Sequence, residues 1–350
     1  MANPPEVRFL KAPFISRRHL VGGAAALAGA SMLPGLARGQ GAPLVWYTGS
    51  QVEAVDMWVK MFKEKTGQTC DYYRAGGLNI ARKYEQELKA NQVKCSLVGG
   101  GLTGLFKLWA DKGMLTSYKS PEYVHYPADT ILPNDTGGPI KADITSMIYN
   151  TEMIKAEDAP KTYEDLLDPK WKGKMVMSDA GSSAGALHWF SAVRKAFGRS
   201  YLEKLAKQDI LIRTGSGEVV NTVVSGERPL AAMVLIYHAQ IAMSKGAKNL
   251  EIIIPTEGVP VSWSHICIAK DPPNLEWAQK FLDFTMSKEA QLAWRDKFFT
   301  GSARDDLPPP PPGAIAVDKV KRLASTSADL QEYFEKNAEI SDEWTDLFKS

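Results

Sequence analysis

The sequence contains few of the residues that most enzymes and metal sites depend on. Its 350 residues include five histidines and three cysteines, Cys70, Cys95 and Cys267. Their spacing fits no zinc or iron–sulfur motif, and an odd number of cysteines cannot all pair within one chain. Each cysteine lies in an apolar or strand-like run, so we expect buried free thiols, with a Cys70–Cys95 disulfide as the open alternative. We predict no cofactor and no metal site.

Long hydrophobic runs and a strong charge of one sign are also missing. No stretch is long and apolar enough to span a bilayer, and the formal net charge is only +2. Residues 1–39 hold five basic residues and one acidic residue, which leaves 37 basic and 39 acidic residues in the rest of the chain. This balance predicts no nucleic-acid partner and no binding to an anionic membrane.

The N-terminus carries the features of an export signal. Arg17 and Arg18 precede a short Gly- and Ala-rich apolar stretch, residues 20–33, and small residues follow at 37–39. A twin arginine, a weakly apolar segment and a small-residue cleavage site are typical of the twin-arginine export route. We therefore expect residues 1–39 to be a signal and the mature chain to begin near Gln40, in the periplasm. An uncleaved membrane-anchor segment is the alternative.

The next part of the chain alternates strand-like and helical patterns. Apolar strand-like runs end in glycine or polar turns, and each is followed by apolar residues at helical spacing. The strands are expected at 43–49, 68–75 and 94–101, and the helices at 55–62, 80–88 and 105–109. Strands that alternate with helices in this way predict an α/β fold with parallel strands joined by helical crossovers.

This arrangement predicts where a ligand would bind. In open parallel sheets, ligands lie at the carboxyl ends of the strands, beside helix N-termini. Here those ends are 48–51, 74–78 and 99–103, which are small, polar or basic and hold no cluster of catalytic side chains. The candidate ligand-binding residues from these turns are Thr48, Gly49, Ser50, Arg74 and Gly101.

The middle of the chain repeats the plan, so that about 310 mature residues are expected to form two lobes. Strands are predicted at 144–151, 171–178, 209–213 and 229–239, with a helix over 183–197. Residues 251–270 are apolar and suited to an extended crossover. Residues 274–294 predict one long amphipathic helix, and residues 307–313 predict a surface polyproline segment.

Gly181 to Gly185 spell G-x-S-x-G, which is the pattern of a hydrolase nucleophile elbow around Ser183. A triad needs a histidine in reach and an acid behind it, and none of the histidines is placed for this. The second interpretation is an anion-binding turn, because free N–H groups at a helix N-terminus favour negative charge. Its residues would be Ser182, Ser183 and Ala184. A plain helix cap is the third alternative.

A second turn of the same kind follows the strand at 209–213. Ser216 opens a helix there, and its role is either ligand binding or capping. Arg213 and Arg74 both lie at strand ends, where a guanidinium can bind carboxylate or phosphate with two hydrogen bonds. A surface ion pair is the alternative for each arginine.

Segments such as VWYTG, FKEKTGQTCDYYRAGG and AQKFLDFTMSKEAQ, in their order along the chain, resemble those of the periplasmic solute-binding proteins of ABC importers. The branch is the one that includes iron(III)-, 2-aminoethylphosphonate- and phosphoglycerate-binding members. The segments run through nearly the whole mature chain, and they include VWYTG, FKEKTGQTCDYYRAGG, YEDLLDPKWKGKMVMSD, SGERPLAAMVLIYHA, AQKFLDFTMSKEAQ and EKNAEISDEWTDLF. The resemblance implies the type II periplasmic-binding-protein fold, in which two α/β lobes are joined by two extended crossovers and hold a ligand between them. It assigns 40–142 and 257–350 to lobe 1 and 143–256 to lobe 2.

The resemblance also implies a function without catalysis. Such a protein captures a solute by closing its lobes and then docks on a membrane permease, and a monomer suits this cycle. Iron(III)-binding members use a pair of tyrosines, but here Tyr237 matches one and Ile236 takes the other position. We therefore expect a small anion such as a phosphonate, phosphate ester or carboxylate. Glu257 is a candidate partner for an ammonium group on it, and iron bound by Tyr237 with an added anion is the alternative.

Overall fold

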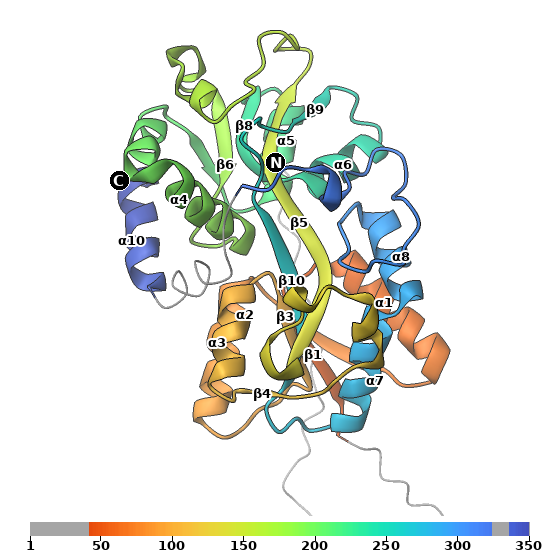
Figure 1. Ribbon diagram of the computed structural model, residues 1–350. Coiled ribbons are helices and arrows are strands. Elements are labelled where there is room, and N and C mark those ends of the chain that lie inside the picture. The colour runs from red at the N-terminus through yellow and green to blue at the C-terminus, as the bar shows by residue number, and fades with distance from the viewer. Residues whose placement is uncertain (1–41, 324–335, 350) are drawn as a thin grey trace, which may run out of the picture. The chain divides into compact units, whose positions relative to one another are not determined.

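Strands and helices alternate along the chain, as the sequence predicts. The structure, a computed structural model, describes residues 42–323 and 336–349, so the predicted export signal, 1–39, lies outside the described residues. The strands are β1 (Leu44–Thr48), β2 (Cys70–Arg74), β3 (Leu97–Gly100), β4 (Leu115–Thr116), β5 (Gly137–Asn150), β6 (Met175–Ser178), β7 (Leu211–Arg213), β8 (Leu230–Leu235), β9 (Leu250–Ile253) and β10 (Val261–Ala269). The helices are α1 (Val52–Thr66), α2 (Gly77–Lys89), α3 (Thr103–Asp111), α4 (Ala184–Ala206), α5 (Ser216–Val224), α6 (Ile236–Ser244), α7 (Leu275–Met286), α8 (Lys288–Phe298) and α10 (Asn337–Phe348) (Figure 1).

One continuous sheet connects all the strands. Its order is β2-β1-β3-β10-β5-β8-β6-β7, with β4 paired to β10 and β9 paired to β5. The strands β2, β1 and β3 are parallel, and so are β8, β6 and β7, which confirms the predicted parallel flanks. The two central strands, β10 and β5, are antiparallel to their neighbours.

The long strand β5 connects the two halves of the sheet. Its residues 137–144 pair with β10, and its residues 145–150 pair with β8 and β9. All of its residues are buried. Figure 1 shows it running from the group around β1 and β3 to the group around β6 and β8. This strand is one of the extended crossovers implied by the family resemblance, and residues 254–264, which follow β9 and include the start of β10, return the chain.

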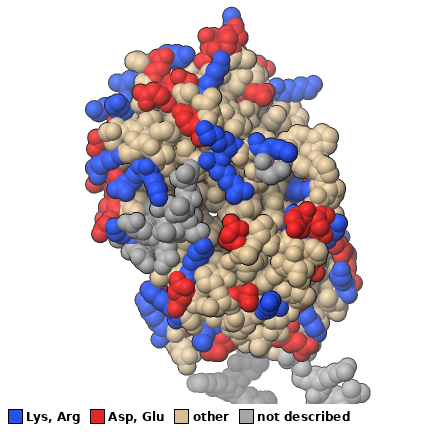
Figure 2. Space-filling model, viewed as in Figure 1, with Lys and Arg blue, Asp and Glu red and all other residues tan. Residues whose placement is uncertain are grey.

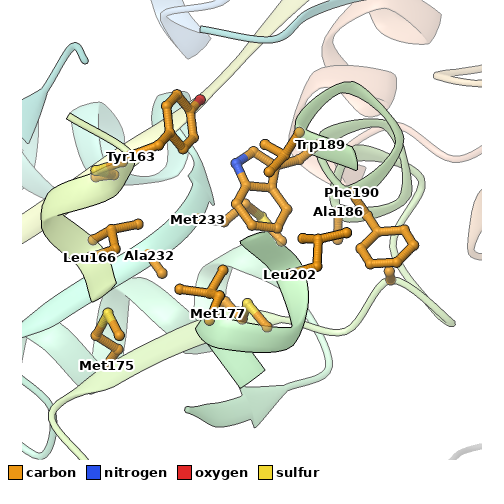
Figure 3. Close-up of a cluster of buried hydrophobic side chains, with 14 of the residues drawn as sticks. Tyr163, Leu166, Met175, Met177, Ala186, Trp189, Phe190, Leu202, Ala232 and Met233 are labelled. Atoms are coloured by element: carbon orange, nitrogen blue, oxygen red, sulfur yellow. The ribbon is translucent and has the colours of Figure 1, made fainter. Parts of the chain in front are cut away.

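Each half of the sheet has its own buried core. On the first half, aromatic side chains of α1, α7 and α8 pack on β1, with Trp58 and Trp294 at 4.1 Å between ring centroids. On the second half, side chains of α4 pack on β6 and β8. Figure 3 shows Trp189 beside Met233, and Phe190 beside Leu202, in this cluster. Among the described residues, no helix combines the length and apolar character needed to cross a membrane.

The C-terminal helix α10 packs against α4. Trp344 stacks on Phe348 at 4.6 Å and meets Phe190 edge-on at 5.4 Å, so the helix belongs to the core of the second half of the sheet. The predicted boundaries instead group 257–350 with the first lobe. The local sequence pattern could not assign this helix to a lobe, because an apolar helix face can pack on the core of either lobe. Only the tertiary structure places it against α4.

Two predicted elements differ in the structure. The apolar run 229–239 is a strand only to Leu235, and Tyr237 lies in the first turn of α6. The single helix predicted over 274–294 is two helices, because Ser287 is extended (φ −63°, ψ 153°) and its hydroxyl accepts the N–H of Ala290 at the start of α8. The three cysteines are buried and free, which confirms that expectation and removes the disulfide alternative.

Candidate functional site

A cavity of about 290 Å³ lies where the two halves of the sheet meet, and we call it the central cavity. Turns from both halves line it together with side chains of β5 and β10. The lining residues are Gly49, Ser50, Gln51, Arg74, Gly76, Gly77, Gly100, Gly101, Lys141, Asp143, Ser182, Ser183, Ala184, Gly185, Thr214, Gly215, Ser216, Gly217, Leu235, Tyr237, His238, Ser262 and Ser264. Most of the residues predicted from strand ends and helix starts are therefore brought together at one place.

Several helix N-termini meet at the central cavity. The residues at the starts of α1, α2, α4, α5 and α6 all belong to its lining. Helix starts leave N–H groups without intrahelical partners and carry partial positive charge. The starts of α1, α2, α5 and α6 have no side-chain cap, whereas α4 is capped by Ser183, whose Oγ accepts the Ala186 N–H at 3.3 Å. The predicted plain cap thus holds for the Ser183 hydroxyl, and no side-chain cap covers the other four starts.

The turn after β1 positions a serine and an arginine. The Ser50 N–H donates to Thr48 Oγ1 at 3.1 Å, and Arg74 Nε donates to the Ser50 carbonyl at 2.7 Å. The Ser50 side chain is 5% exposed and its hydroxyl has no hydrogen-bond partner in the described part of the chain. Arg74 has no ion pair with a described carboxylate. Thr48 is fully buried and lies outside the lining, so it positions Ser50 instead.

Asp179 fixes the turn that precedes α4. Its carboxylate accepts the Gly181 N–H at 2.9 Å and the Ser182 hydroxyl at 3.3 Å, and its carbonyl accepts the Ser183 N–H at 3.0 Å. From α10, Trp344 Nε1 donates to the same carboxylate at 2.9 Å. Ser182 also donates to the Thr214 carbonyl at 3.0 Å, which joins this turn to the start of α5.

Lys349, just after α10, donates to the Asp179 carboxylate at 2.8 Å. Burial alone would raise the pKa of Asp179, but Lys349, the Gly181 N–H and Trp344 together lower that pKa below its usual value. Asp179 is therefore a charged centre that holds the 179–183 turn in place and ties it to the C-terminal helix.

Ser216 at the start of α5 is occupied by the protein itself. Its Oγ accepts the Leu235 N–H at 3.1 Å and lies 3.2 Å from the hydroxyl of Ser178. The hydroxyl thus connects β6, β8 and α5, and the capping interpretation fits it better than a free ligand donor. The neighbouring glycines, Gly215 and Gly217, also line the central cavity.

The central cavity contains a buried ion pair that sequence reasoning missed. Lys141 and Asp143 of β5 form it with side chains 6% and 7% exposed, and the Ser264 hydroxyl of β10 donates to Asp143 Oδ2 at 3.0 Å. Lysine and aspartate two positions apart in the otherwise apolar run GPIKADITSMIYN were the available signal, because residues i and i+2 of a strand share a face.

Tyr237 and His238 contribute two stacked rings, 4.2 Å apart. The Lys141 Nζ lies 4.9 Å from the centroid of the Tyr237 ring. Burial and the nearby Asp143 raise the pKa of the Tyr237 phenol, so it stays protonated near neutral pH. Burial and the charge of Lys141 lower the pKa of His238 to about 4, so that its imidazole is neutral.

Besides Thr48, two more predicted ligand residues do not line the central cavity. Arg213 donates to both carboxylate oxygens of Glu227 at 2.7 Å, so the alternative interpretation of this arginine, an ion pair within the protein, is the correct one. Glu257 accepts the backbone N–H of Tyr163 at 3.0 Å, so its carboxylate holds a turn. Neither side chain lines the central cavity. The sequence pattern could not exclude these two residues from the ligand site, because their partners lie up to 94 positions away along the chain.

Two other features lie away from the central cavity. A larger space of about 710 Å³ lies beside the polyproline segment, but its arginines already bind protein groups, as Arg295 does with the Pro308 carbonyl. His125, Asp305 and Asp306 form the one group with metal-ligand chemistry in the described part of the chain. Asp306 in that group is ion-paired to Arg304 and Lys288, so two basic side chains already pair with its carboxylate.

Comparison with known proteins identifies the family. Residues 102–316 match the sequence profile of the family described as bacterial extracellular solute-binding protein. The chain belongs to this family. The family is described as one of extracellular solute-binding proteins, and the relatives named for 2-aminoethylphosphonate are named as periplasmic proteins.

This solute-binding protein has relatives with different ligands in their names. It is 24% identical over 260 residues to a protein of Salmonella typhimurium named as a 2-aminoethylphosphonate-binding periplasmic protein, covering 71% of this chain and 73% of the relative. It is 27% identical over 161 residues to Iron uptake protein A1 of Synechocystis, covering 41% of this chain and 44% of the relative.

Solved structures share the fold. The periplasmic binding protein AfuA from Actinobacillus pleuropneumoniae, solved with fructose-6-phosphate, has a TM-score of 0.77 at 23% identity, covering 88% of this chain and 98% of that one. Iron-bound HitA from Pseudomonas aeruginosa has a TM-score of 0.77 at 21% identity, covering 86% and 99%. These matches confirm the predicted α/β fold of the solute-binding protein.

Proposed function

We propose that this solute-binding protein captures a small anion, a phosphonate, phosphate ester or carboxylate, in the central cavity and delivers it to a membrane permease. One observation carries the proposal. Ser50 is 5% exposed, its hydroxyl has no hydrogen-bond partner among the described residues, and it lies beside Arg74, which has no described carboxylate partner. Buried polar groups are normally hydrogen-bonded, and an unpaired guanidinium next to free helix-start amides favours an oxyanion.

The ligand-binding groups fall on both sides of a hinge. We assign residues 40–142 and 257–323 to one lobe and 143–256 to the other, and we place α10 with the second lobe because it packs on α4. Gly49, Ser50, Arg74 and Gly101 would bind from the first lobe. Ser182, Ser183, Ala184, Ser216 and Tyr237 would bind from the second. Closure about β5 and residues 254–264 then sequesters the anion.

Ferric iron is the second candidate, because relatives are named for it. It fits this cavity less well, because a phenol must lose its proton to serve as a strong ferric ligand, and burial beside Asp143 raises the pKa of Tyr237. Ile236 replaces the second tyrosine of the iron(III)-binding pattern, and Asp143 is already engaged by Lys141. A single neutral phenol supplies too few anionic donors for the ion.

We further propose that the protein is exported by the twin-arginine route, acts as a monomer, catalyses no reaction and binds no nucleic acid. Arg17 and Arg18 support the route, although they lie outside the described residues. Ser183 Oγ accepts a backbone N–H, and no hydrogen bond joins it to a described histidine, which argues against a hydrolase. Figure 2 shows basic and acidic side chains interspersed over the visible face, unlike a nucleic-acid-binding surface.

The test is ligand-dependent stabilisation of the purified protein. Phosphonates, phosphate esters, dicarboxylates and ferric citrate are compared by thermal unfolding, since an anion present at 100 times its Kd should add about 2.7 kcal/mol to the unfolding free energy. Ser50→Ala should weaken the shift, whereas Arg213→Gln, outside the cavity, should leave it unchanged. If no anion shifts the transition, the proposed ligand class is wrong. Cleavage of a generic ester that is lost in Ser183→Ala would instead support the hydrolase.

A further inference from the structure

The central cavity combines anion-binding groups with one internally neutralised carboxylate. Among the described residues of its lining, Asp143 is the one acidic side chain, and the basic ones are Arg74 and Lys141. His238 is held neutral by burial. The charge available to a ligand therefore comes from Arg74 and the helix starts, provided that Lys141 and Asp143 cancel each other.

The geometry shows that they do. Lys141 donates to both carboxylate oxygens of Asp143, and its remaining face lies over the Tyr237 ring at 4.9 Å. Asp143 Oδ2 also accepts the Ser264 hydroxyl at 3.0 Å. Both side chains are at most 7% exposed. The pair is thus closed on itself, with its charges satisfied by protein groups from β5, β10 and α6.

A ligand that carries an ammonium group has no carboxylate to meet it here. Taking Asp143 from Lys141 would leave a buried ammonium unpaired, which is strongly unfavourable. Leaving the pair intact would strand the ligand's own charge in a desolvated cavity. The acids next to the lining turns are also engaged, because Asp179 pairs with Lys349 and accepts the Gly181 N–H, and Glu218 accepts the Thr214 N–H at 3.2 Å.

We propose that the Lys141–Asp143 pair is a specificity device, which directs the cavity to anions with an uncharged body and against zwitterions such as aminophosphonates. This inference rests on the proposed function and deepens it. It also separates this protein from the relatives that are named for 2-aminoethylphosphonate. Ser262 and Ser264 line the same cavity, and serine hydroxyls suit a ligand body that is uncharged, with or without hydroxyl groups of its own.

The experiment compares matched ligands by titration calorimetry. The first pair is 2-hydroxyethylphosphonate and 2-aminoethylphosphonate, and the second is n-propyl phosphate and O-phosphoethanolamine. In at least one pair, we expect the ligand without an ammonium group to have a Kd at least about tenfold lower than its partner. The reason is that the ammonium group loses its hydration in the cavity and gains no carboxylate partner. Tighter binding of the ammonium member overturns this inference alone. Failure of every anion in both pairs and in the wider panel overturns the proposed function, and this inference with it.

Variants of the pair test the cause. Lys141→Met frees Asp143 to accept a ligand ammonium, so the preference should reverse toward the zwitterion, whereas Lys141→Arg should keep it. Lys280→Met, which removes an exposed lysine of α7 that pairs with Glu276 and lies over the Trp277 ring, away from the cavity, is the matched control and should leave the preference unchanged. If Lys141→Met does not fold, the double variant Lys141→Met/Asp143→Asn removes both charges and should bind the two members of a pair about equally. An unchanged preference in that double variant contradicts the proposed role of the pair.

Discussion

Replacing Trp344 with phenylalanine should destabilise the protein by removing one hydrogen bond between the C-terminal helix and the turn before α4. The indole is fully buried, and its Nε1 donates to the Asp179 carboxylate at 2.9 Å. Phenylalanine keeps an aromatic ring between Phe190 and Phe348 but offers no donor. The carboxylate would then hold the 179–183 turn with one partner fewer.

The magnitude follows from the charge and burial of the acceptor. The Asp179 side chain is 13% exposed, so the lost bond is a charge-assisted one in a largely dry place. Such bonds contribute about 1.5–3 kcal/mol. Lys349, whose side chain is 39% exposed, is screened by solvent, and Lys349→Met should cost less than about 1 kcal/mol.

Urea unfolding at neutral pH measures the effect, and Trp294→Phe supplies the matched control. Trp294 is 1% exposed, but its indole nitrogen has no hydrogen-bond partner in the described structure, so that variant loses ring volume alone. The excess loss in Trp344→Phe should become smaller in an Asp179→Asn background, where a neutral amide oxygen replaces the carboxylate as the acceptor, and a double-mutant cycle measures this coupling. Hydrogen exchange at 181–186 should also accelerate. Equal losses in the two tryptophan variants would refute the role given to Asp179.

Three further outcomes are expected. Arg74→Gln should weaken anion binding roughly tenfold to hundredfold in calorimetry, as loss of a charge-assisted bond implies, and an effect as small as that of Arg213→Gln would exclude Arg74 from the site. Burial lowers the pKa of His188 in the folded state to about 4. Between about pH 6.5 and pH 4 the unfolded chain therefore binds one more proton at this histidine than the folded protein does. The contribution of His188 to the unfolding free energy is complete above about pH 6.5 and falls toward pH 4 by up to about 1.4 kcal/mol per pH unit. His188→Met should reduce the slope by this share in unfolding measured from pH 7 to 4, while the buried His238 and His265, whose pKa values are also lowered to about 4, keep their own shares, and an unaltered slope would show that His188 contributes nothing to it. Gly301→Ala should cost about 1–3 kcal/mol in urea unfolding, because the added methyl would overlap Val317, and wild-type stability would mean that the segment shifts freely.

Local pattern was sufficient for the parts of the site that a strand end and the next helix start determine. Ser50 follows β1, Ser183 caps α4 and Ser216 opens α5, all at turns that the sequence marks with small and polar residues. The parallel strands place these turns on one side of the sheet. The sequence therefore predicted a ligand site made of helix starts, and the structure brings those turns to one cavity.

Partners far apart in the chain were beyond such reasoning. Arg213 and Arg74 have the same pattern, and only the position of Glu227 distinguishes the ion-paired arginine from the one beside the cavity. Tyr237 was expected on a strand, because its apolar run gives no helical period before Leu235. The break at Ser287 was missed because serine within an amphipathic run is also tolerated inside helices.

The sequence by itself determined the α/β class, the order of strands and helices, and the turns with free amides, because these depend on spacing and on residue type within a few positions. The tertiary structure alone decided that Lys141 and Asp143 line the cavity. It also decided that Asp143 accepts the hydroxyl of Ser264, which lies 121 positions away along the chain. It also decided that α10 holds Asp179, 165 positions before Trp344. These contacts depend on the antiparallel register of β5 with β10 and on the packing of α10 against α4, which no short stretch of sequence specifies.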